Sequence, residues 1–296
     1  MMRERLKAAF IGPGGVRALW RIALFAAFWY LSERLLFPVV ARFYTFSPGG
    51  FAPLDILVVD TVDALYLLAV SVLLVRLERH RTSWFGLGLG RGTLRLFGAG
   101  CLYAFGMLTL LLAICWACGY VRVTGLGEHG TQLWKYGALW LAAMLAVGLS
   151  EELQYRGYAL ASLTRGLGFW PAALLTSLVF VWDHMSKPME TVPDLLNIGL
   201  LGLLVCYSVR LTGSLWFAIG FHAAFDFLAL GFYGSPNTGN AGMPLPHHLL
   251  ATEIAGPAWL TGGPQGLEAS LLMPPLILGT AWLLRRRYRG VRYPHD

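Results

Sequence analysis

Long apolar runs recur from the first fifty residues of the chain to the last thirty. A helix needs about 20 apolar residues to cross a hydrocarbon layer about 30 Å thick. Backbone polar groups in lipid must pair within their own segment, and the runs lack the alternation of barrel strands, so we expect helices. Eight membrane spans are predicted, at about 22–40, 56–75, 96–118, 136–158, 169–184, 195–209, 214–230 and 268–284.

Composition agrees with this pattern. Of the 296 residues, 56% are hydrophobic and 13% are charged, whereas about 25% of the residues in a soluble domain carry a charge. The four cysteines all lie within apolar stretches, so no disulfide framework is predicted. The predicted fold is all-α, with the whole chain, 1–296, forming a single polytopic membrane helix bundle.

The net charge of +7 does not indicate a nucleic-acid partner, because the basic residues form short clusters at the ends of apolar runs. An eight-span topology places these clusters on one side, so the positive-inside rule predicts that both termini are cytoplasmic. Residues 1–21 are predicted to form a basic interfacial segment. The Gly- and Pro-rich stretch 231–267, which holds His247 and His248, is predicted to be a surface loop on the opposite side.

Three polar clusters interrupt the apolar runs of the second half. An ionisable group at membrane depth costs at least about 2.5 kcal/mol, so its presence there needs a reason. The first cluster, at 150–156, contains Glu151, Glu152 and Arg156. Glu152 precedes Arg156 by four residues, the favourable orientation for a helical ion pair. Glu151 lies about 100° further round the helix, which leaves it free to hold a water molecule or a metal ion.

The other two clusters each place two side chains four residues apart, on one face of an apolar helix. One cluster pairs Phe180 with His184, and the other pairs His222 with Asp226. A single histidine on an apolar helix is more often a packing residue than a functional one. The combination of the three clusters therefore indicates a functional site, whereas one cluster alone does not.

A helical hairpin can bring the first two clusters together. If the chain reverses near 166–168, both Glu151 and His184 lie about 22 to 26 Å from the turn, at about 1.5 Å per residue. A carboxylate and an imidazole then meet at the same depth inside a dry bundle. Such a pair can activate a water molecule by general base catalysis.

The three motifs resemble those of the CPBP family, which comprises the type II CAAX prenyl endopeptidases and the bacteriocin-processing, Abi-like membrane proteases. The motifs are Glu151-Glu152-x-x-x-Arg156, Phe180-x-x-x-His184 and His222-x-x-x-Asp226, preceded by Thr-Gly-Ser-Leu-Trp at 212–216. The resemblance covers about one third of the chain and implies a catalytic core at 136–230, with the active site inside the membrane. It implies that Glu151 is the base, that His184 helps to hold the attacking water, and that His222 stabilises the oxyanion.

Asp226 departs from the family pattern, in which this position is often Asn. An ionised Asp cannot donate a hydrogen bond to an oxyanion, so Asp226 is expected to be protonated, to accept a ring proton from His222, or to bind a metal ion. The preferred mechanism uses no cofactor. The alternative is a metalloprotease in which Glu151, His184 and His222 hold zinc with one open position.

A membrane-associated protein or peptide within the lipid bilayer is the expected substrate, and a lipid-modified, CAAX-like C-terminal tail would suit an intramembrane cavity. A non-enzymatic membrane protein is the alternative function, either a proton-coupled transporter or an immunity scaffold, because buried Glu, His and Asp residues also form proton relays. The polar motif residues are confined to the second half of the chain, and no matching pair of broken helices indicates inverted repeats. Both observations disfavour a transporter.

Overall fold

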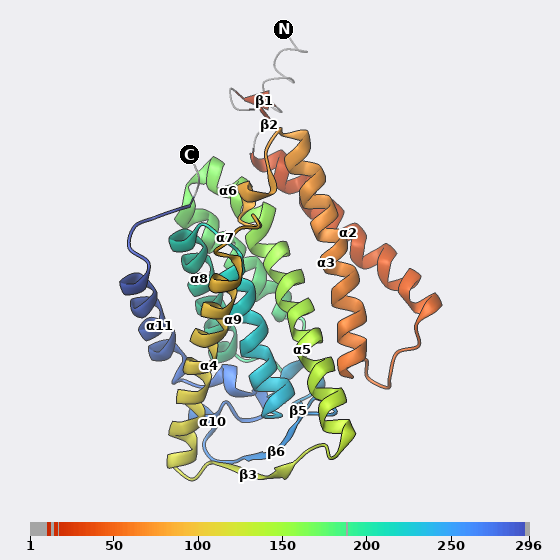
Figure 1. Ribbon diagram of the computed structural model, residues 1–296, viewed down its shortest axis with the longest axis vertical. Coiled ribbons are helices and arrows are strands. Elements are labelled where there is room, and N and C mark those ends of the chain that lie inside the picture. Colours follow the sequence, from red (N-terminus) through yellow and green to blue (C-terminus); the bar gives the residue numbers. More distant parts are fainter. Residues whose placement is uncertain (1–10, 13–14, 17, 188, 294–296) are drawn as a thin grey trace.

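A computed structural model describes residues 11–12, 15–16, 18–187 and 189–293. These residues form a bundle of long helices (Figure 1), so the predicted all-α membrane fold is confirmed. The predicted basic segment 1–21 lies largely outside the described residues. The helices are α2 (Ala18–Phe43), α3 (Pro53–Leu77), α4 (Thr93–Ala117), α5 (Thr131–Glu152), α6 (Tyr158–Leu167), α7 (Phe169–His184), α8 (Val192–Thr212), α9 (Trp216–Asp226), α10 (Ala258–Thr261) and α11 (Met273–Arg287).

Each of the eight predicted runs contains a helix, but only five helices of the described chain are long and apolar enough to cross a membrane. The longest of these, Thr131–Leu167, joins α5 and α6 and extends well beyond the predicted 136–158. By contrast, α7 has 16 residues and α11 has 15. The predicted start of the last span at Glu268 is wrong, because prolines occupy the first turn of α11 and fix its beginning at Met273.

The predicted surface loop at 231–267 is instead mostly folded. We call residues 233–272 the cap. It contains β4 (Pro236–Asn237), β5 (Met243–Pro244), β6 (Leu250–Ile254), α10 and several 3₁₀ turns, among them η6 (Leu267–Ala269). Strand β6 pairs antiparallel with β3 (Val121–Leu126), which connects α4 to α5. The cap therefore closes the end of the bundle opposite α6 (Figure 1).

The vicinal histidines lie in this cap. His247 Nδ1 lies 2.7 Å from Glu128 Oε1, and the His247 ring stacks on Tyr136 with ring centroids 3.8 Å apart. His248 Nδ1 donates to the carbonyl oxygen of Leu245 at 2.8 Å. His247 therefore holds the cap against the start of α5, and His248 stabilises a turn within the cap, which the sequence pattern did not indicate.

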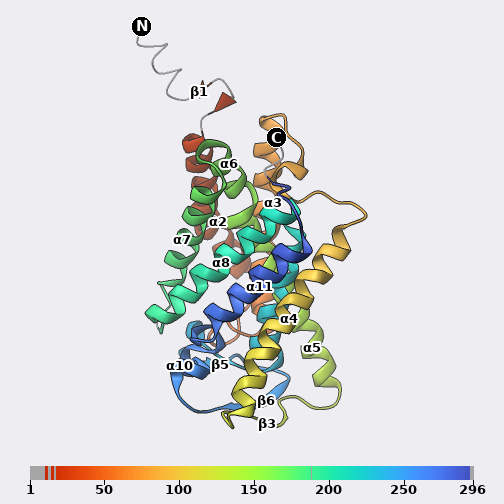
Figure 2. The same ribbon diagram turned by 90° about the vertical axis from the view of Figure 1, so that its left-hand side faces the viewer.

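Helix α9 runs through the centre of the bundle, between α4 and α5 (Figures 1 and 2). Glycines allow its close approach to α4. A Cβ atom at Gly220 would lie 2.2 Å from the carbonyl oxygen of Phe97, and one at Gly100 would lie 2.1 Å from that of Phe217. Small residues at such contacts let two helix backbones pack directly against each other, as is common in membrane bundles. This contact fixes the position of α9 and therefore of His222.

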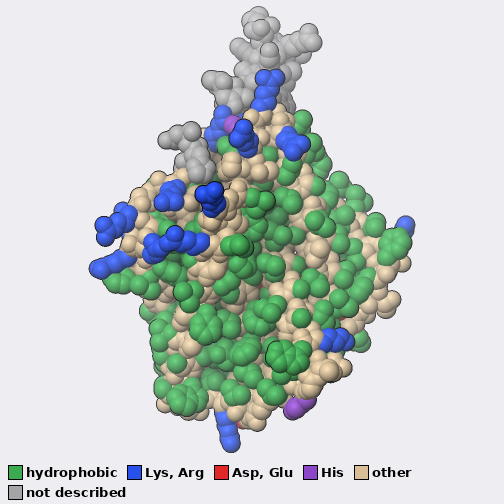
Figure 3. Space-filling model, viewed as in Figure 1, with side chains coloured by type: hydrophobic (Ala, Val, Ile, Leu, Met, Phe, Trp, Pro, Cys, Tyr) green, Lys and Arg blue, Asp and Glu red, His purple; other side chains and the backbone are tan. Residues whose placement is uncertain are grey.

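The surface of the bundle is that of an integral membrane protein. Hydrophobic side chains cover most of the face shown in Figure 3, and Lys and Arg side chains gather towards the end where α6 lies. Large apolar residues such as Leu65, Leu102 and Leu141 are more than half exposed on the long helices. A lipid environment accounts for exposed apolar area on this scale. The cytoplasmic location of the basic end remains a prediction.

Candidate active site

A cavity of about 230 Å³ lies inside the bundle, between α5, α7, α8, α9 and the cap. Its wall brings together all seven side chains that the three motifs single out. These are Glu151, Glu152, Arg156, Phe180, His184, His222 and Asp226. The remaining lining is largely apolar but includes Lys187 and Glu268.

Two π-helical turns interrupt the helices that carry the site. The first, η2 (Leu153–Gly157), directly follows Glu152, and the second, η3 (Phe227–Phe232), directly follows Asp226. A π-helical turn adds a residue to the helix and so rotates the side chains after it. Such turns occur frequently at functional sites. Here each one lies beside an acidic residue of the cavity.

Glu152 and Arg156 form the predicted ion pair, with 3.2 Å between Glu152 Oε1 and Arg156 Nη1. Both side chains are buried, at 0% and 1% exposed. The Arg156 guanidinium also lies over the Phe180 ring, 4.5 Å from its centroid. Gly202 on α8 leaves room for it, because a Cβ atom there would lie 2.8 Å from Arg156 Nη2. A buried pair of this kind offsets the charge of both partners.

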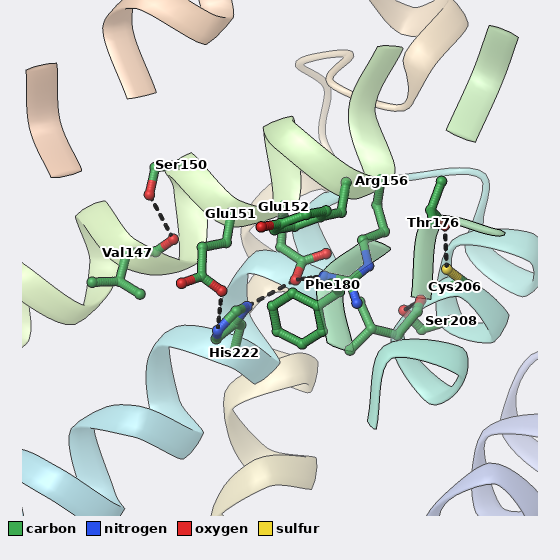
Figure 4. Close-up of polar contacts among 12 residues, drawn as sticks. Val147, Ser150, Glu151, Glu152, Arg156, Thr176, Phe180, Cys206, Ser208 and His222 are labelled. Atoms are coloured by element: carbon green, nitrogen blue, oxygen red, sulfur yellow. Dashed lines mark hydrogen bonds and ion pairs between the residues drawn. The ribbon is translucent and has the colours of Figure 1, made fainter. Parts of the chain in front are cut away.

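Glu151 is the acidic residue that this pair leaves uncompensated. Its side chain is 29% exposed, and its Oε2 lies 3.5 Å from His222 Nε2. Figure 4 shows both glutamates reaching from one helix towards the His222 ring, with Phe180 beside them. The two adjacent carboxylates therefore differ in environment, since Glu152 is paired and enclosed while Glu151 is accessible from the cavity.

Three carboxylates surround His222. Its Nδ1 lies 2.8 Å from Glu152 Oε1, and its Nε2 lies 3.3 Å from Asp226 Oδ2 and 3.5 Å from Glu151. Carboxylates accept hydrogen bonds, so an imidazolium ring can donate to both sides at once. Asp226 thus stands where it can accept the Nε2 proton.

His184 has a different arrangement. Its Nδ1 lies 2.9 Å from the carbonyl oxygen of Phe180. Because a carbonyl only accepts, Nδ1 carries the proton, and in the neutral ring Nε2 is then an acceptor. The Phe180 ring packs against the His184 ring edge to face, with centroids 4.5 Å apart. Phe180 therefore fixes both the orientation and the tautomer of His184.

The zinc alternative stays a prediction, and the surroundings of His222 favour the metal-free mechanism over it. Zinc needs a deprotonated ring nitrogen from each histidine, whereas both ring nitrogens of His222 face carboxylates. Within the described part of the chain, no three or more His, Cys, Asp or Glu side chains are placed to hold a metal ion.

The structure adds residues that the motifs did not include. Asp60 on α3 accepts a hydrogen bond of 2.8 Å from the Ser150 hydroxyl, next to Glu151. Glu268 and Lys187 line the cavity. Asp60 could have been noticed as an acid within the predicted span 56–75. Nothing in the local pattern distinguished Glu268 or Lys187, because only the folding of the cap and the α7–α8 connection brings them to the cavity.

Comparison with known proteins agrees with the motifs. Residues 133–228 match the family model described as "Type II CAAX prenyl endopeptidase Rce1-like". The matched segment runs from α5 into η3 and contains all seven motif residues. The resemblance to the CPBP family is thereby confirmed over about one third of the chain. No curated protein and no solved structure matches the chain.

Proposed function

We propose that this chain, whose residues 133–228 match the Rce1-like type II CAAX prenyl endopeptidase family model, is an intramembrane endopeptidase. It hydrolyses a peptide bond of a membrane-associated protein, using a water molecule activated by Glu151. The observation that carries the proposal is the position of Glu151. It is an accessible carboxylate without a cationic side chain of its own, on the wall of a buried cavity that two histidines share.

In the proposed reaction, a water molecule lies between Glu151 and the acceptor nitrogen of His184. Glu151 removes a proton from this water as the oxygen attacks the carbonyl carbon of the scissile bond. Negative charge then develops on the carbonyl oxygen. The Nε2–H group of His222 lies beside Glu151 and donates to that oxyanion. A preorganised donor in a dry site stabilises such a charge more strongly than water does.

In this scheme Asp226 accepts the Nε2–H of His222 until the oxyanion forms, and that N–H group then donates to the oxyanion, so Asp226 orients the ring without contacting the oxyanion itself. The 3.3 Å separation of Asp226 Oδ2 from His222 Nε2 supports this role. Glu152 does the same at Nδ1, at 2.8 Å. Together the two carboxylates hold the imidazole in one orientation, and the Arg156 guanidinium keeps Glu152 ionised in the interior.

Asp226→Asn is expected to keep most of the activity, with kcat within about tenfold of the wild-type value, because an amide oxygen can still accept the His222 proton. Asp226→Leu, of similar size, is expected to lower kcat by about 100-fold, because a general acid–base or orienting partner contributes on that scale. Peptide hydrolysis by the two purified variants measures the difference. Equal losses in both variants would contradict the proposed acceptor role.

The proposed substrates are membrane polypeptides, and lipid-modified C-terminal tails are included among them. The apolar part of the cavity, lined by residues such as Phe51, Met144 and Leu245, suits an apolar side chain next to the scissile bond. Charged catalytic groups lie beside it. The site therefore fits a peptide that enters from the lipid phase rather than a soluble polar substrate.

A comparison in cells tests the proposal. Membrane proteins are extracted from cells that express the wild-type chain, from cells that express Glu151→Gln, and from cells without the gene. Polypeptides with newly formed C-termini are then identified by mass spectrometry. We expect a small set that shortens only with the wild-type chain. Identical termini in all three extracts would favour a non-enzymatic role.

A further inference from the structure

Glu268 is a cavity residue without a role in the reaction described above. It belongs to the 3₁₀ turn η6, just before α11, and lies outside both the matched segment 133–228 and the three motifs. Its side chain nevertheless lines the same cavity as Glu151, His222 and Asp226. A fourth acidic residue in a largely apolar cavity has a substantial desolvation cost, so it calls for a chemical explanation.

Buried side chains hold the turn that carries Glu268 in place. Asn197 of α8, which is 1% exposed, donates its amide hydrogens to the carbonyl oxygens of Glu268, at 2.7 Å, and of Ser270, at 2.9 Å. The backbone N–H of Leu267 donates to the Ser235 hydroxyl at 3.2 Å. These contacts fix the turn from both sides. Glu268 is thus presented to the cavity by a rigid support, as a group with a defined task would be.

The charges that face Glu268 come from several elements. Asp226 and His222 lie on α9, Lys187 and Glu190 lie in the α7–α8 connection, and Asp194 lies in the first turn of α8. Burial raises the pKa of Glu268 to about 7, and the nearby carboxylates of Asp226 and Glu190 add to the effect against Lys187 and His222. Near neutral pH, a large share of Glu268 therefore carries a proton.

We propose that Glu268 donates the proton that the amine leaving group requires. The inference rests on the proposed peptidase function. In the tetrahedral intermediate, the bond between carbon and nitrogen breaks and its electron pair goes to nitrogen, which takes the Glu268 proton. The proton that Glu151 removed from water returns to Glu268 through solvent. One water molecule is consumed, and an acid and an amine are formed.

Two carboxyl groups on one cavity wall would thus divide the acid and base roles. Glu151 acts as the base, and the partly protonated Glu268 acts as the acid, which is a recurrent arrangement in hydrolytic enzymes. Because the acid must be protonated, wild-type kcat/KM for peptide hydrolysis is expected to fall as pH rises through about 7. Glu268→Gln is expected to remove this alkaline decrease.

The test compares two leaving groups. The first substrate is a peptide that contains a bond cleaved by the wild-type protein. The second is a nitrophenyl ester of the part of that peptide on the N-terminal side of the cleaved bond. A nitrophenolate leaves without protonation, so only the peptide needs the acid. Glu268→Gln is expected to lower kcat about 100-fold on the peptide, with KM little changed, and by less than about threefold on the ester.

Controls separate this proposal from its premise. Glu253→Gln makes the same change at an exposed residue of β6 that does not line the cavity, and it is expected to leave both rates unchanged. Glu151→Gln is expected to hydrolyse neither the peptide nor the ester.

If Glu268→Gln lowers the rates on the peptide and the ester equally, changes only KM, or leaves both rates unchanged, Glu268 is not the proton donor. If Glu268→Gln does not fold, wild-type peptide hydrolysis that stays constant from pH 6 to about pH 9 overturns the proposal. If the wild-type chain hydrolyses neither substrate, the proposed function itself fails.

Discussion

Glu151→Gln is expected to lower kcat for peptide hydrolysis by about 10³-fold, while KM and the thermal unfolding temperature stay close to wild type. The amide cannot accept a proton from the attacking water. It keeps the size of the carboxylate, and at 29% exposure it does not leave a buried charge without a partner. Initial rates of purified protein in lipid vesicles, measured at saturating peptide, report the loss.

The matched control is Glu253→Gln, the same change at an exposed residue of β6. It is expected to retain the wild-type rate. A chelator is expected to leave the wild-type rate unchanged, because both ring nitrogens of His222 face carboxylates. A wild-type rate that disappears with chelator and returns with zinc would contradict the metal-free mechanism. A Glu151→Gln rate within about tenfold of wild type would remove Glu151 from the role of base.

Gly220→Ala is expected to destabilise the folded protein by about 3 kcal/mol or more, since overpacking against a rigid backbone is among the most disruptive core changes. The new methyl group would lie 2.2 Å from the carbonyl oxygen of Phe97. Neither helix can relieve the clash with a side-chain rotation, so α9 must move away from α4. His222 moves with it, and activity is expected to fall with stability. Thermal unfolding in detergent, together with the yield of monodisperse protein, measures the effect.

Gly98→Ala provides the comparison on the partner helix. A Cβ atom there meets nothing within 4 Å, and alanine is favoured over glycine within a helix by up to about 1 kcal/mol. Gly98→Ala is therefore expected to unfold at or slightly above the wild-type temperature. If Gly220→Ala were equally well tolerated, the close packing of α4 against α9 would not be what positions His222.

The motif side chains could be predicted from sequence because their spacing obeys helix geometry. The four-residue step from Glu152 to Arg156 gives the observed ion pair. Equal distances from the turn near 166–168 place Glu151 and His184 on the wall of one cavity. Hydrophobic run length likewise predicts where helices form. These features depend on local periodicity, which a single sequence contains.

Other features depend on tertiary contacts and could not be predicted in this way. The stretch 231–267 has the composition of a loop, yet β6 finds its partner β3 more than a hundred residues earlier in the chain. Glu268 reaches the cavity only because Asn197 holds its turn. The predicted run at 268–284 starts too early, because hydropathy does not register that prolines set the start of α11 at Met273.

The most direct measurement uses purified wild-type and Glu151→Gln protein in vesicles of defined lipid. Each is incubated with detergent-solubilised membrane proteins from a strain that lacks the gene, and the C-termini of the products are sequenced by mass spectrometry. The account predicts new C-termini at defined bonds with the wild-type protein and none with Glu151→Gln. The same new termini with both proteins, or none with either, would contradict it.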